Sequence, residues 1–375
     1  MKLTLDRSSA LAALSRVAGG VSKKPQMPIL AHVLLTARDG ALQITATDLD
    51  MQITDIAQAH VHSPGQATVS AATFGDLLRN LPDGSDAELQ LMPNGQLSVR
   101  AVRAKFSLPT LPPADFPLMA IDGEQSEIEL PASALRRLLT VTRMAVGNEA
   151  VRFFLNGAYF HAGEMPDGSP SLRVVTTDGL RMVVVDMPAP ENAETLSPSI
   201  VPARALDTML KLAGDTDHPV TVRLTGTRVV MISGETQFVS KLLDGTYPPY
   251  DRVIPASCPI VVPVDRDLLT GAIKRVAVMA GDKSRSLALE LSSGKLAISA
   301  RDVDMGSAGE EIEVEFHGEA LHMGLNARHA IEALDGVSGE TVEIHIQNAV
   351  SPVMLRDSKD AARLFILVPL RGGAS

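Results

Sequence analysis

Cysteine, tryptophan and aromatic side chains are scarce in this chain of 375 residues. Cys258 is the single cysteine, so the chain cannot form an internal disulfide, and such cysteine usage is typical of a reducing cytoplasm. There is no tryptophan, and aromatic residues make up only 3% of the chain. This composition argues against a surface that binds single-stranded nucleic acid by base stacking. We expect Cys258 to be a structural or surface thiol.

Long apolar runs are also missing. No stretch reaches the roughly 18 apolar residues of a membrane span. The opening segment Met1–Asp6 contains an acid and no apolar run, so a signal peptide is not expected. Hydrophobic residues still make up 45% of the chain, enough for ordinary cores. We therefore expect a cytoplasmic protein of two or three globular domains, without membrane contact.

The familiar catalytic and metal-binding motifs are absent as well. The sequence has no glycine-rich phosphate loop, no His-Glu-x-x-His, no paired cysteines and no Gly-x-Ser-x-Gly. His60 and His62 form the only close histidine pair, and their alternation is typical of one face of a strand. We expect no metal and no cofactor.

One short segment occurs three times. Thr47-Asp48-Leu49-Asp50-Met51 and Arg301-Asp302-Val303-Asp304-Met305 each follow an alternating apolar stretch, and Thr177-Asp178-Gly179-Leu180-Arg181-Met182 lies between them. The middle copy differs by what we interpret as an inserted Gly179 and an exchange of the second aspartate for Arg181. A spacing of about 125 residues is far longer than a solenoid repeat of roughly 20–50 residues. The pattern therefore indicates one globular module present three times.

Each module has the same predicted order of elements: strand, helix, strands, helix, strands. The first helices follow Ser8-Ser9, Pro131 and Asp265, which are helix-opening residues. The second helices are predicted over 71–81, 203–212 and 327–334. Hairpins are predicted around Asp39-Gly40 and Ser292–Lys295. The fold class is α+β, with two helices on antiparallel sheets in each module, and proline-rich seams divide the chain into residues 1–120, 121–254 and 255–375.

The first helix of each module is basic inside an acidic protein. The chain carries a net charge of −10, yet residues 7–24, 131–148 and 266–285 carry +4, +3 and +3. Three equivalent basic helices would form a positive surface that binds a polyanion without reading its sequence. The DNA-contact candidates from these helices are Lys23, Lys24, Arg136, Arg137, Arg143, Lys274 and Arg275.

Two other classes of function stay open at this point. Asp48, Asp178 and Asp302 are possible acid/base groups of a cytosolic hydrolase, but they lack a partner base, nucleophile or metal. They are better explained as side chains that cap a turn after a strand. An acidic oligomeric scaffold that never touches DNA is the third possibility, and the basic helices argue against it.

Several ordered blocks resemble the family of bacterial DNA polymerase III beta subunits, the replicative sliding clamps. These blocks include Lys24–Leu30, Thr47–Met51, Phe106–Pro112, Val151–Gly157 and Tyr247–Tyr250. The resemblance implies three clamp-type domains per protomer and a head-to-tail homodimer that closes into a six-domain ring around duplex DNA. It implies a processivity factor, which is an accessory subunit in DNA replication. The nucleotidyltransferase activity then belongs to the DNA-directed DNA polymerase that the subunit serves.

The resemblance also implies three sets of site residues. For DNA it adds Arg152, Phe153 and Phe154 to Lys24, whereas Glu149 and Ala72 replace family residues that touch DNA. The partner pocket, for linear peptides of the replicative polymerase, the clamp loader, other polymerases and repair proteins, is expected at Leu155, Thr177, Gly179, Leu180, Arg181, Met182, Pro248, Arg252, Val253, Asn326, His329, Val350, Pro352, Ile366, Val368, Pro369, Leu370 and Arg371. The dimer interface is expected at Arg103, Lys105, Phe106, Leu108, Val278, Met279, Asp302, Asp304, Glu310 and Glu311.

Three of the pocket positions depart from the family pattern. Leu180 stands where a histidine is common, His329 replaces a tyrosine and Pro352 replaces a serine. We therefore expect a peptide preference that differs in detail from that of the relatives.

Overall fold

A computed structural model describes residues 1–22, 24–121, 123, 126–215, 217–281 and 285–370. The chain forms two compact units: Met1–Leu135 with Thr195–Ser197 and Asp207–Leu242, and Arg136–Glu194 with Pro198–Leu206 and Leu243–Ser375. All strand pairs among the described residues are antiparallel, as the α+β prediction requires.

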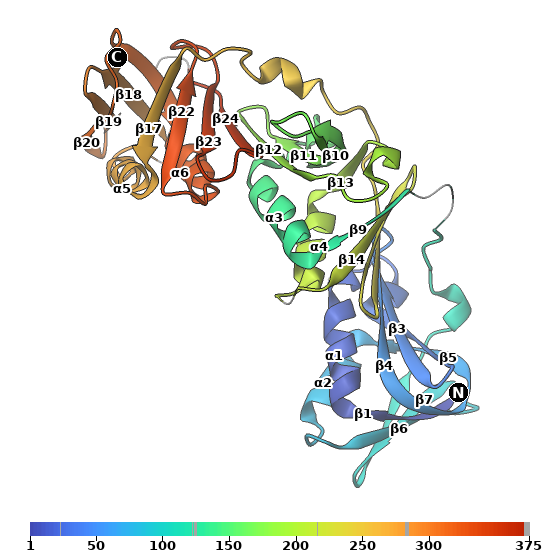
Figure 1. Cartoon of the computed structure of the whole chain (residues 1–375). Coiled ribbons are helices and arrows are strands. Elements are labelled where there is room, and N and C mark those ends of the chain that lie inside the picture. The colour runs from blue at the N-terminus through green and yellow to red at the C-terminus, as the bar shows by residue number, and fades with distance from the viewer. Residues whose placement is uncertain (23, 122, 124–125, 216, 282–284, 371–375) are drawn as a thin grey trace. The chain divides into compact units, whose positions relative to one another are not determined.

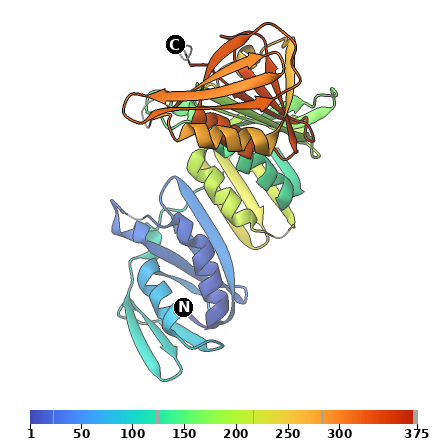
Figure 2. The ribbon, with the colours of Figure 1, turned by 90° about the vertical axis from the view of Figure 1, so that its left-hand side faces the viewer.

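The N-terminal module follows the predicted order of elements. It contains β1 (Lys2–Asp6), α1 (Arg7–Val17), β2 (His32–Arg38), β3 (Ala41–Thr47), β4 (Met51–Ser63), β5 (Gly65–Ser70), α2 (Ala71–Asn80), β6 (Asp86–Leu91), β7 (Gln96–Ala101) and β8 (Ala104–Pro109). Helices α1 and α2 pack side by side (Figure 2). The expected cap was wrong by two residues. Asp6, and not Ser8 or Ser9, caps α1, because its carboxylate accepts the Ser9 N–H at 2.7 Å.

The middle module repeats that order. It contains β9 (Ser126–Pro131), α3 (Ala132–Thr142), β10 (Gly157–Glu164), β11 (Pro170–Thr177), β12 (Arg181–Pro188), β13 (Ser199–Pro202), α4 (Ala203–Ala213), β14 (Pro219–Leu224), β15 (Arg228–Ser233), β16 (Thr236–Lys241) and the 3-10 turn η7 (Tyr250–Val253). Helix α3 follows Pro131 directly, as predicted.

The C-terminal module is the third copy. It contains β17 (Ile260–Asp265), α5 (Arg266–Ala277), β18 (Ser286–Ser292), β19 (Lys295–Asp302), β20 (Gly306–Glu313), β21 (Leu321–Asn326), α6 (Ala327–Asp335), β22 (Thr341–Ile346), β23 (Val353–Asp357) and β24 (Arg363–Leu367). The predicted cap of α5 is confirmed, since Asp265 accepts the Leu268 N–H at 2.7 Å. The predicted hairpin is confirmed too, with Ser293 and Gly294 between β18 and β19.

Sheets continue from one module into the next. In the first unit, β4 pairs with β1 and β3 of its own module and also with β16 of the middle module, which makes one sheet of 12 strands. In the second unit, β12 of the middle module pairs with β24 of the C-terminal module within a sheet of eight strands (Figure 1). Backbone hydrogen bonds therefore connect each module to its neighbour.

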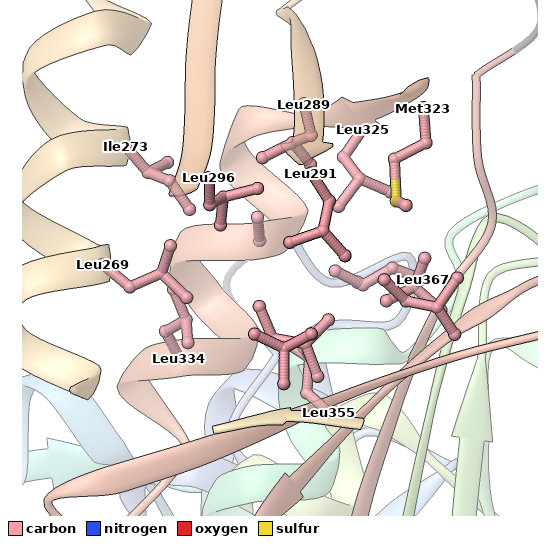
Figure 3. Close-up of a pocket in the computed structure, with 15 residues that line it drawn as sticks. Leu269, Ile273, Leu289, Leu291, Leu296, Met323, Leu325, Leu334, Leu355 and Leu367 are labelled. Atoms are coloured by element: carbon pink, nitrogen blue, oxygen red, sulfur yellow. The ribbon is translucent and has the colours of Figure 1, made fainter. Parts of the chain in front are cut away.

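The core of the C-terminal module lies between its two helices and the strands that they cover. Side chains such as Leu269 and Ile273 from α5 and Leu334 from α6 converge on leucines of the strands around a void of about 40 Å³ (Figure 3). Every residue that lines this void is apolar, so the void offers no hydrogen-bond partner to a water molecule.

Candidate functional site

The three repeated aspartates cap equivalent turns, which confirms that prediction. The Oδ1 atom of Asp48 accepts the N–H groups of Asp50 at 3.1 Å and Met51 at 2.8 Å. Asp178 and Asp302 make the same pair of bonds to the residues two and three positions later, at 2.9–3.1 Å. A carboxylate engaged in this way fixes the backbone, in the manner of an Asx turn.

The interpretation of Gly179 as an insertion was wrong. Asp48 and Asp178 both reach the residue three positions later, so the two turns have equal length. Leu49 and Gly179 occupy the same position with φ angles of 78° and 88°. Glycine adopts this left-handed conformation without strain, whereas leucine does not. Leu180 therefore replaces Asp50, and Arg181 replaces Met51.

Arg181 gives the middle turn a second set of bonds. Its Nε donates to Asp178 at 3.0 Å, and its Nη1 bonds Glu332 of α6. Glu332 also accepts from Arg328 at 2.7 Å. Burial works to raise the pKa of Glu332, but the hydrogen bonds from Arg181 and Arg328 outweigh burial and hold that pKa below its ordinary value. The turn of the middle module is thus attached to a helix of the C-terminal module.

Several of the predicted pocket residues meet where β12 pairs with β24. Met182 pairs with Ile366, and the N–H of Val368 donates to the carbonyl of Leu180 at 2.9 Å. The N–H of Leu370 donates to Gly324 at 2.8 Å, which holds the segment after β24 beside β21. Residues from distant parts of the sequence are therefore neighbours at this junction. Arg371 lies outside the described residues.

The predicted pocket residues fall into a buried group and an accessible group. Leu155, Met182 and Ile366 are at most 4% exposed and belong to one apolar cluster under the junction. Leu180 is 54% exposed and Val253 is 43% exposed, so these side chains are available to a ligand. Half-buried or exposed members of the set are Thr177, Gly179, Pro248, Arg252, Asn326, His329, Val350, Pro352, Val368, Pro369 and Leu370. The site would therefore bind a ligand through an apolar surface with a few polar groups.

The sequence reasoning missed the residues beneath this surface. Tyr247 and Tyr250 are each 6% exposed and pack into the same apolar cluster. The hydroxyl of Tyr250 lies 3.0 Å from Nε2 of His161, a residue 89 positions away. The block Tyr247–Tyr250 was visible in the sequence as a proline-rich seam and as a resemblance, and nothing in the pattern connects it with His161.

Three sequence profiles match the chain in succession. The N-terminal domain of the DNA polymerase III beta subunit matches residues 1–120, the central domain matches residues 129–249, and the C-terminal domain matches residues 251–371. The chain belongs to the DNA polymerase III beta subunit family. The resemblance stated from the sequence blocks is thereby confirmed.

Full-length relatives agree with this assignment. The beta sliding clamp of Caulobacter vibrioides (strain NA1000 / CB15N) is 36% identical over 372 residues, which cover 99% of this chain and 100% of that protein. The beta sliding clamp of Escherichia coli (strain K12) is 34% identical over 375 residues, with 99% and 100% coverage. A crystal structure of the Caulobacter crescentus beta sliding clamp matches with a TM-score of 0.95 at 36% identity, covering 99% of both chains. The three-domain fold is therefore the clamp fold.

The DNA-contact candidates of this beta subunit differ in how strongly neighbouring side chains of the same chain bind them. Lys24 is exposed, and Lys23 lies outside the described residues. Arg152 donates to both carboxylate oxygens of Glu149, at 2.9 and 2.6 Å. Phe153 is 45% exposed, and its ring meets that of Phe154 edge-on with centroids 6.0 Å apart. A phenylalanine offers no hydroxyl to a phosphate, so this pair can contact DNA only through its apolar faces.

The basic helices are largely neutralised by acids of the fold. Arg16 bonds the fully buried Asp55 of β4. Arg137 donates to Asp360 from Nε at 3.2 Å and from Nη2 at 2.5–2.7 Å, and its side chain is only 31% exposed. Lys274 pairs with Asp335 at 3.4 Å, and Arg275 pairs with Glu310 at 2.5 Å. A simple count of charges along the sequence therefore overstates the charge these helices offer to a polyanion.

Most of the expected dimer residues lie on or beside two sheet edges of the beta subunit, and Val278 and Met279 follow α5. β8 is the end strand of the first unit's sheet, and β20 is the end strand of a four-stranded sheet in the second unit. Phe106 on β8 is 37% exposed, but Leu108 is only 6% exposed because it packs into its own module. Leu108 therefore offers a partner almost no surface. Arg103, Lys105, Asp304 and Glu311 are exposed, and Met279, Asp302 and Glu310 are half-buried.

A cavity of about 350 Å³ lies at the end of α5. Val278, which is 61% exposed, lines it together with Met305 from the turn before β20. The start of α6 supplies Arg328, Ile331 and Glu332. The lining is mainly apolar, with charged groups at one side.

Metal and membrane features are absent from the described parts of the chain. Among residues 1–22, 24–121, 123, 126–215, 217–281 and 285–370, no group of three His, Cys, Asp or Glu side chains could hold a metal ion. Within those same ranges, no helix is long and apolar enough to cross a membrane.

Proposed function

We propose that this chain is a DNA sliding clamp, a processivity factor that encircles duplex DNA and tethers the replicative polymerase and other DNA-processing proteins. The observation that carries the proposal is the full-length match to beta sliding clamps in both sequence and three-domain fold. Under this proposal the chain is an accessory subunit in the cytoplasm. Nucleotidyl transfer belongs to the polymerase that it holds.

The proposed ring closes through the edge strands β8 and β20. An unpaired edge strand readily accepts another strand, and a head-to-tail contact between unlike edges can close into a ring. Arg103 and Lys105 lie at the β8 edge, and Glu310 and Glu311 lie on β20. We propose that Phe106 of one protomer enters the cavity beside Val278 of its partner. The opposite charges would orient the approach, while the apolar contact would supply most of the affinity.

The proposed DNA contacts are few and weak. Lys24, Arg136, Arg143 and Phe153 remain candidates. Arg137 is held by Asp360 and Arg152 by Glu149, so each of these two arginines would have to leave its acid to reach a phosphate. Contacts of this kind neutralise phosphate charge without reading bases, so the protein can move along the duplex. A closed ring then holds its polymerase to DNA by topology.

The proposed partner site is the junction of β12 and β24. Exposed Leu180 and Val253, with the half-buried Val368 and Leu370, suit a short extended peptide that has apolar anchors. The proposed ligands are peptides of the replicative polymerase, the clamp loader, other polymerases and repair proteins. In support, the solved Caulobacter crescentus clamp carries polyethylene glycol at a region assigned to beta-motif tethering.

Loading on DNA tests the whole proposal. The protein is loaded on nicked circular DNA with its clamp loader, the complex is isolated, and the DNA is then cut once. A sliding clamp is expected to stay on the circle and to leave the linear DNA through its ends. Equal retention on both forms, or no loading at all, would contradict the proposal.

A further inference from the structure

A row of polar side chains crosses three strands of the middle module on one face of the sheet. His161 of β10 lies opposite Arg173 of β11, and Arg173 lies opposite Asp186 of β12. Two positions along, Tyr159 and Val175 are likewise opposite each other. Residues two apart share a face of a strand, so all of these side chains project to the same side.

The row is held together by charge and by close packing. Arg173 donates from Nε and Nη2 to the two oxygens of Asp186, at 2.8 and 2.9 Å. Ser171 donates to the same carboxylate at 2.7 Å, and Asp186 is only 4% exposed. Gly163 leaves room for the guanidinium, because a Cβ there would lie 3.1 Å from Nε of Arg173. Arg173 therefore has little freedom to move.

His161 and Tyr250 extend the row to another part of the chain. Nδ1 of His161 lies 2.6 Å from the carbonyl of Ala162, which can only accept, so Nδ1 carries the proton. Nε2 of the neutral ring is then the acceptor for the hydroxyl of Tyr250, at 3.0 Å. Tyr247 stacks on Tyr159 with ring centroids 4.7 Å apart and planes 4° apart. Two buried tyrosines thus hold the segment that contains η7 on this face of the sheet.

That segment carries part of the proposed partner site. Arg252 and Val253 lie two and three positions after Tyr250 in η7, and Pro248 lies between the two tyrosines. We infer that His161, Arg173 and Asp186 are positioning residues of the partner site, which act through Tyr250 to hold Arg252 and Val253 against an incoming peptide. This inference rests on the proposed function and assigns a role to residues that do not themselves touch the peptide.

The hydrogen bond makes the positioning sensitive to pH. Burial lowers the pKa of His161, the carbonyl of Ala162 raises it, and the neighbouring Arg173 lowers it further. Asp186 and Asp251 are the acids that face the ring, and Tyr159 and Tyr250 are the other titratable neighbours. A protonated ring cannot accept the tyrosine proton, so Nε2 would have to donate to the hydroxyl instead, and the charged ring would face Arg173. Since the folded pKa lies below the ordinary value of about 6.5, Nε2 accepts from Tyr250 above that pH, and this arrangement is replaced as pH falls through the folded value.

Peptide binding by variants of the full-length protein tests the inference. The probe is a fluorescein-labelled peptide with Leu and Phe anchors, and binding is measured by anisotropy between pH 5 and 8. Tyr250→Phe and His161→Leu are each expected to weaken binding about three- to tenfold at pH 7.5, the effect of one lost hydrogen bond. His161→Gln keeps a polar atom for the hydroxyl and should recover part of the affinity. Between pH 8 and 5, the peptide affinity of His161→Gln should also fall less than that of the wild type, because glutamine does not titrate.

Thr176→Val is the matched control. Thr176 is a fully buried residue of the same strand as Arg173, and its hydroxyl donates to the carbonyl of Thr142 at 2.7 Å. The variant loses a buried hydrogen bond on the other face of the sheet, so it should lose stability without losing affinity. His329, a half-buried histidine of the partner site, also titrates, so the wild-type pH profile is compared with those of His161→Gln and His329→Gln.

The outcomes separate the inference from the function on which it rests. If the wild-type protein loads on DNA and binds the peptide, while Tyr250→Phe and both His161 variants bind as tightly as wild type at every pH, the positioning role is wrong. If Thr176→Val weakens binding as much as Tyr250→Phe, the effect is general destabilisation, and the inference is likewise wrong. A wild-type protein that neither loads nor binds the peptide would instead overturn the proposed function.

Discussion

Asp178 bonds a charged side chain as well as the backbone of its own turn. Each of the three aspartates accepts two backbone N–H groups, but Asp178 also accepts from Arg181, which in turn bonds Glu332. The same short segment therefore closes a turn in all three modules. In the middle module it forms part of a charged cluster beside the proposed partner site.

Removing this carboxylate should separate the structural role from the binding role. We expect Asp178→Ala to lower the free energy of unfolding by about 1–3 kcal/mol and to weaken peptide binding roughly tenfold, because the turn loses its acceptor and Arg181 keeps only Glu332. Denaturant titration and fluorescence anisotropy measure the two effects. Asp48→Ala removes the same turn acceptor in the N-terminal module, so it should reduce stability but leave peptide affinity unchanged. A similar loss of affinity in both variants would contradict the assignment.

Glu149 decides how much charge Arg152 offers to DNA. The hydrogen bond from Arg152 lowers the pKa of Glu149, burial opposes this, and the positive charge of Arg152 lowers it further, so the acid is ionised at neutral pH. We expect Glu149→Gln to release Arg152 for phosphate. The log–log slope of duplex affinity against salt concentration should then become steeper by about 0.9, the value for one additional neutralised phosphate.

A duplex titration at several salt concentrations measures that slope. Glu235→Gln, which neutralises an exposed acid in the β15–β16 turn, is the control and should leave the slope unchanged. Equal slopes for Glu149→Gln and wild type would show that Arg152 does not reach DNA.

At the scale of elements, α3 is attached to the loop before β24 by one ion pair. Arg137 and Asp360 are 223 residues apart in sequence, yet they share a bidentate contact, and Arg363 adds an ion pair to the same carboxylate at 2.9 Å. We expect Arg137→Ala to lower the free energy of unfolding by about 1–3 kcal/mol, because Asp360 loses a partly buried partner. Denaturant titration should detect this loss, while the salt dependence of duplex binding stays unchanged.

Lys24→Ala is the complementary variant. Lys24 is exposed, so its removal should flatten the salt dependence of duplex binding and leave stability within about 0.5 kcal/mol of wild type. If Arg137→Ala flattened the slope as Lys24→Ala does, the original assignment of Arg137 to DNA would be restored.

The small void in the core of the C-terminal module offers a test of packing between elements (Figure 3). Val262 of β17 lines this void, whereas Val264, on the same face of the strand, does not. We expect Val262→Ile to raise the free energy of unfolding by up to about 0.8 kcal/mol, the contribution of one buried methylene. Val264→Ile should instead lower the free energy of unfolding by about 1–3 kcal/mol, because Val264 does not border the void and the added methylene would overpack the core. Thermal unfolding measures both, and a loss of stability in Val262→Ile would show that the void cannot accept it.

At the scale of the whole molecule, the proposed ring depends on two sheet edges that carry opposite charges. We expect Arg103→Glu combined with Lys105→Glu to raise the dissociation constant of the dimer at least tenfold at low salt, because β8 would then repel the acids of β20. Analytical ultracentrifugation measures the constant. Two of those acids already have partners in the same chain, since Arg275 bonds Glu310 and Lys295 bonds Glu311 at 2.9 Å. The effect should therefore be much smaller at high salt.

Charge reversal on the other edge completes this test. Glu311→Lys should restore part of the dimer affinity in the double variant, whereas Glu235→Lys, on a turn of the first unit, should not. A dimer that stays intact in the double variant at low concentration and low salt would contradict the charge pairing.

The sequence alone determined the elements and the repeat, because both depend on local patterns. The second helices, the hairpin at Ser293 and Gly294 and the turns of Asp48, Asp178 and Asp302 all follow from residues within a few positions of one another. The equal length of the turns could not be read in the same way. It depends on Leu49 adopting the left-handed conformation that glycine adopts at position 179, and leucine has no intrinsic preference for it.

The tertiary structure decided which distant strands and side chains are neighbours. It pairs β4 with β16 and β12 with β24, directs Arg137 to Asp360, and places His161 under Tyr250. Each of these contacts joins residues far apart in the chain, so no local period or spacing reports it. The same holds for charge, because a sequence gives the number of basic residues but only the fold pairs them with buried acids such as Asp55. Sequence thus defined three similar modules, and long-range packing made one of them the proposed site for partners.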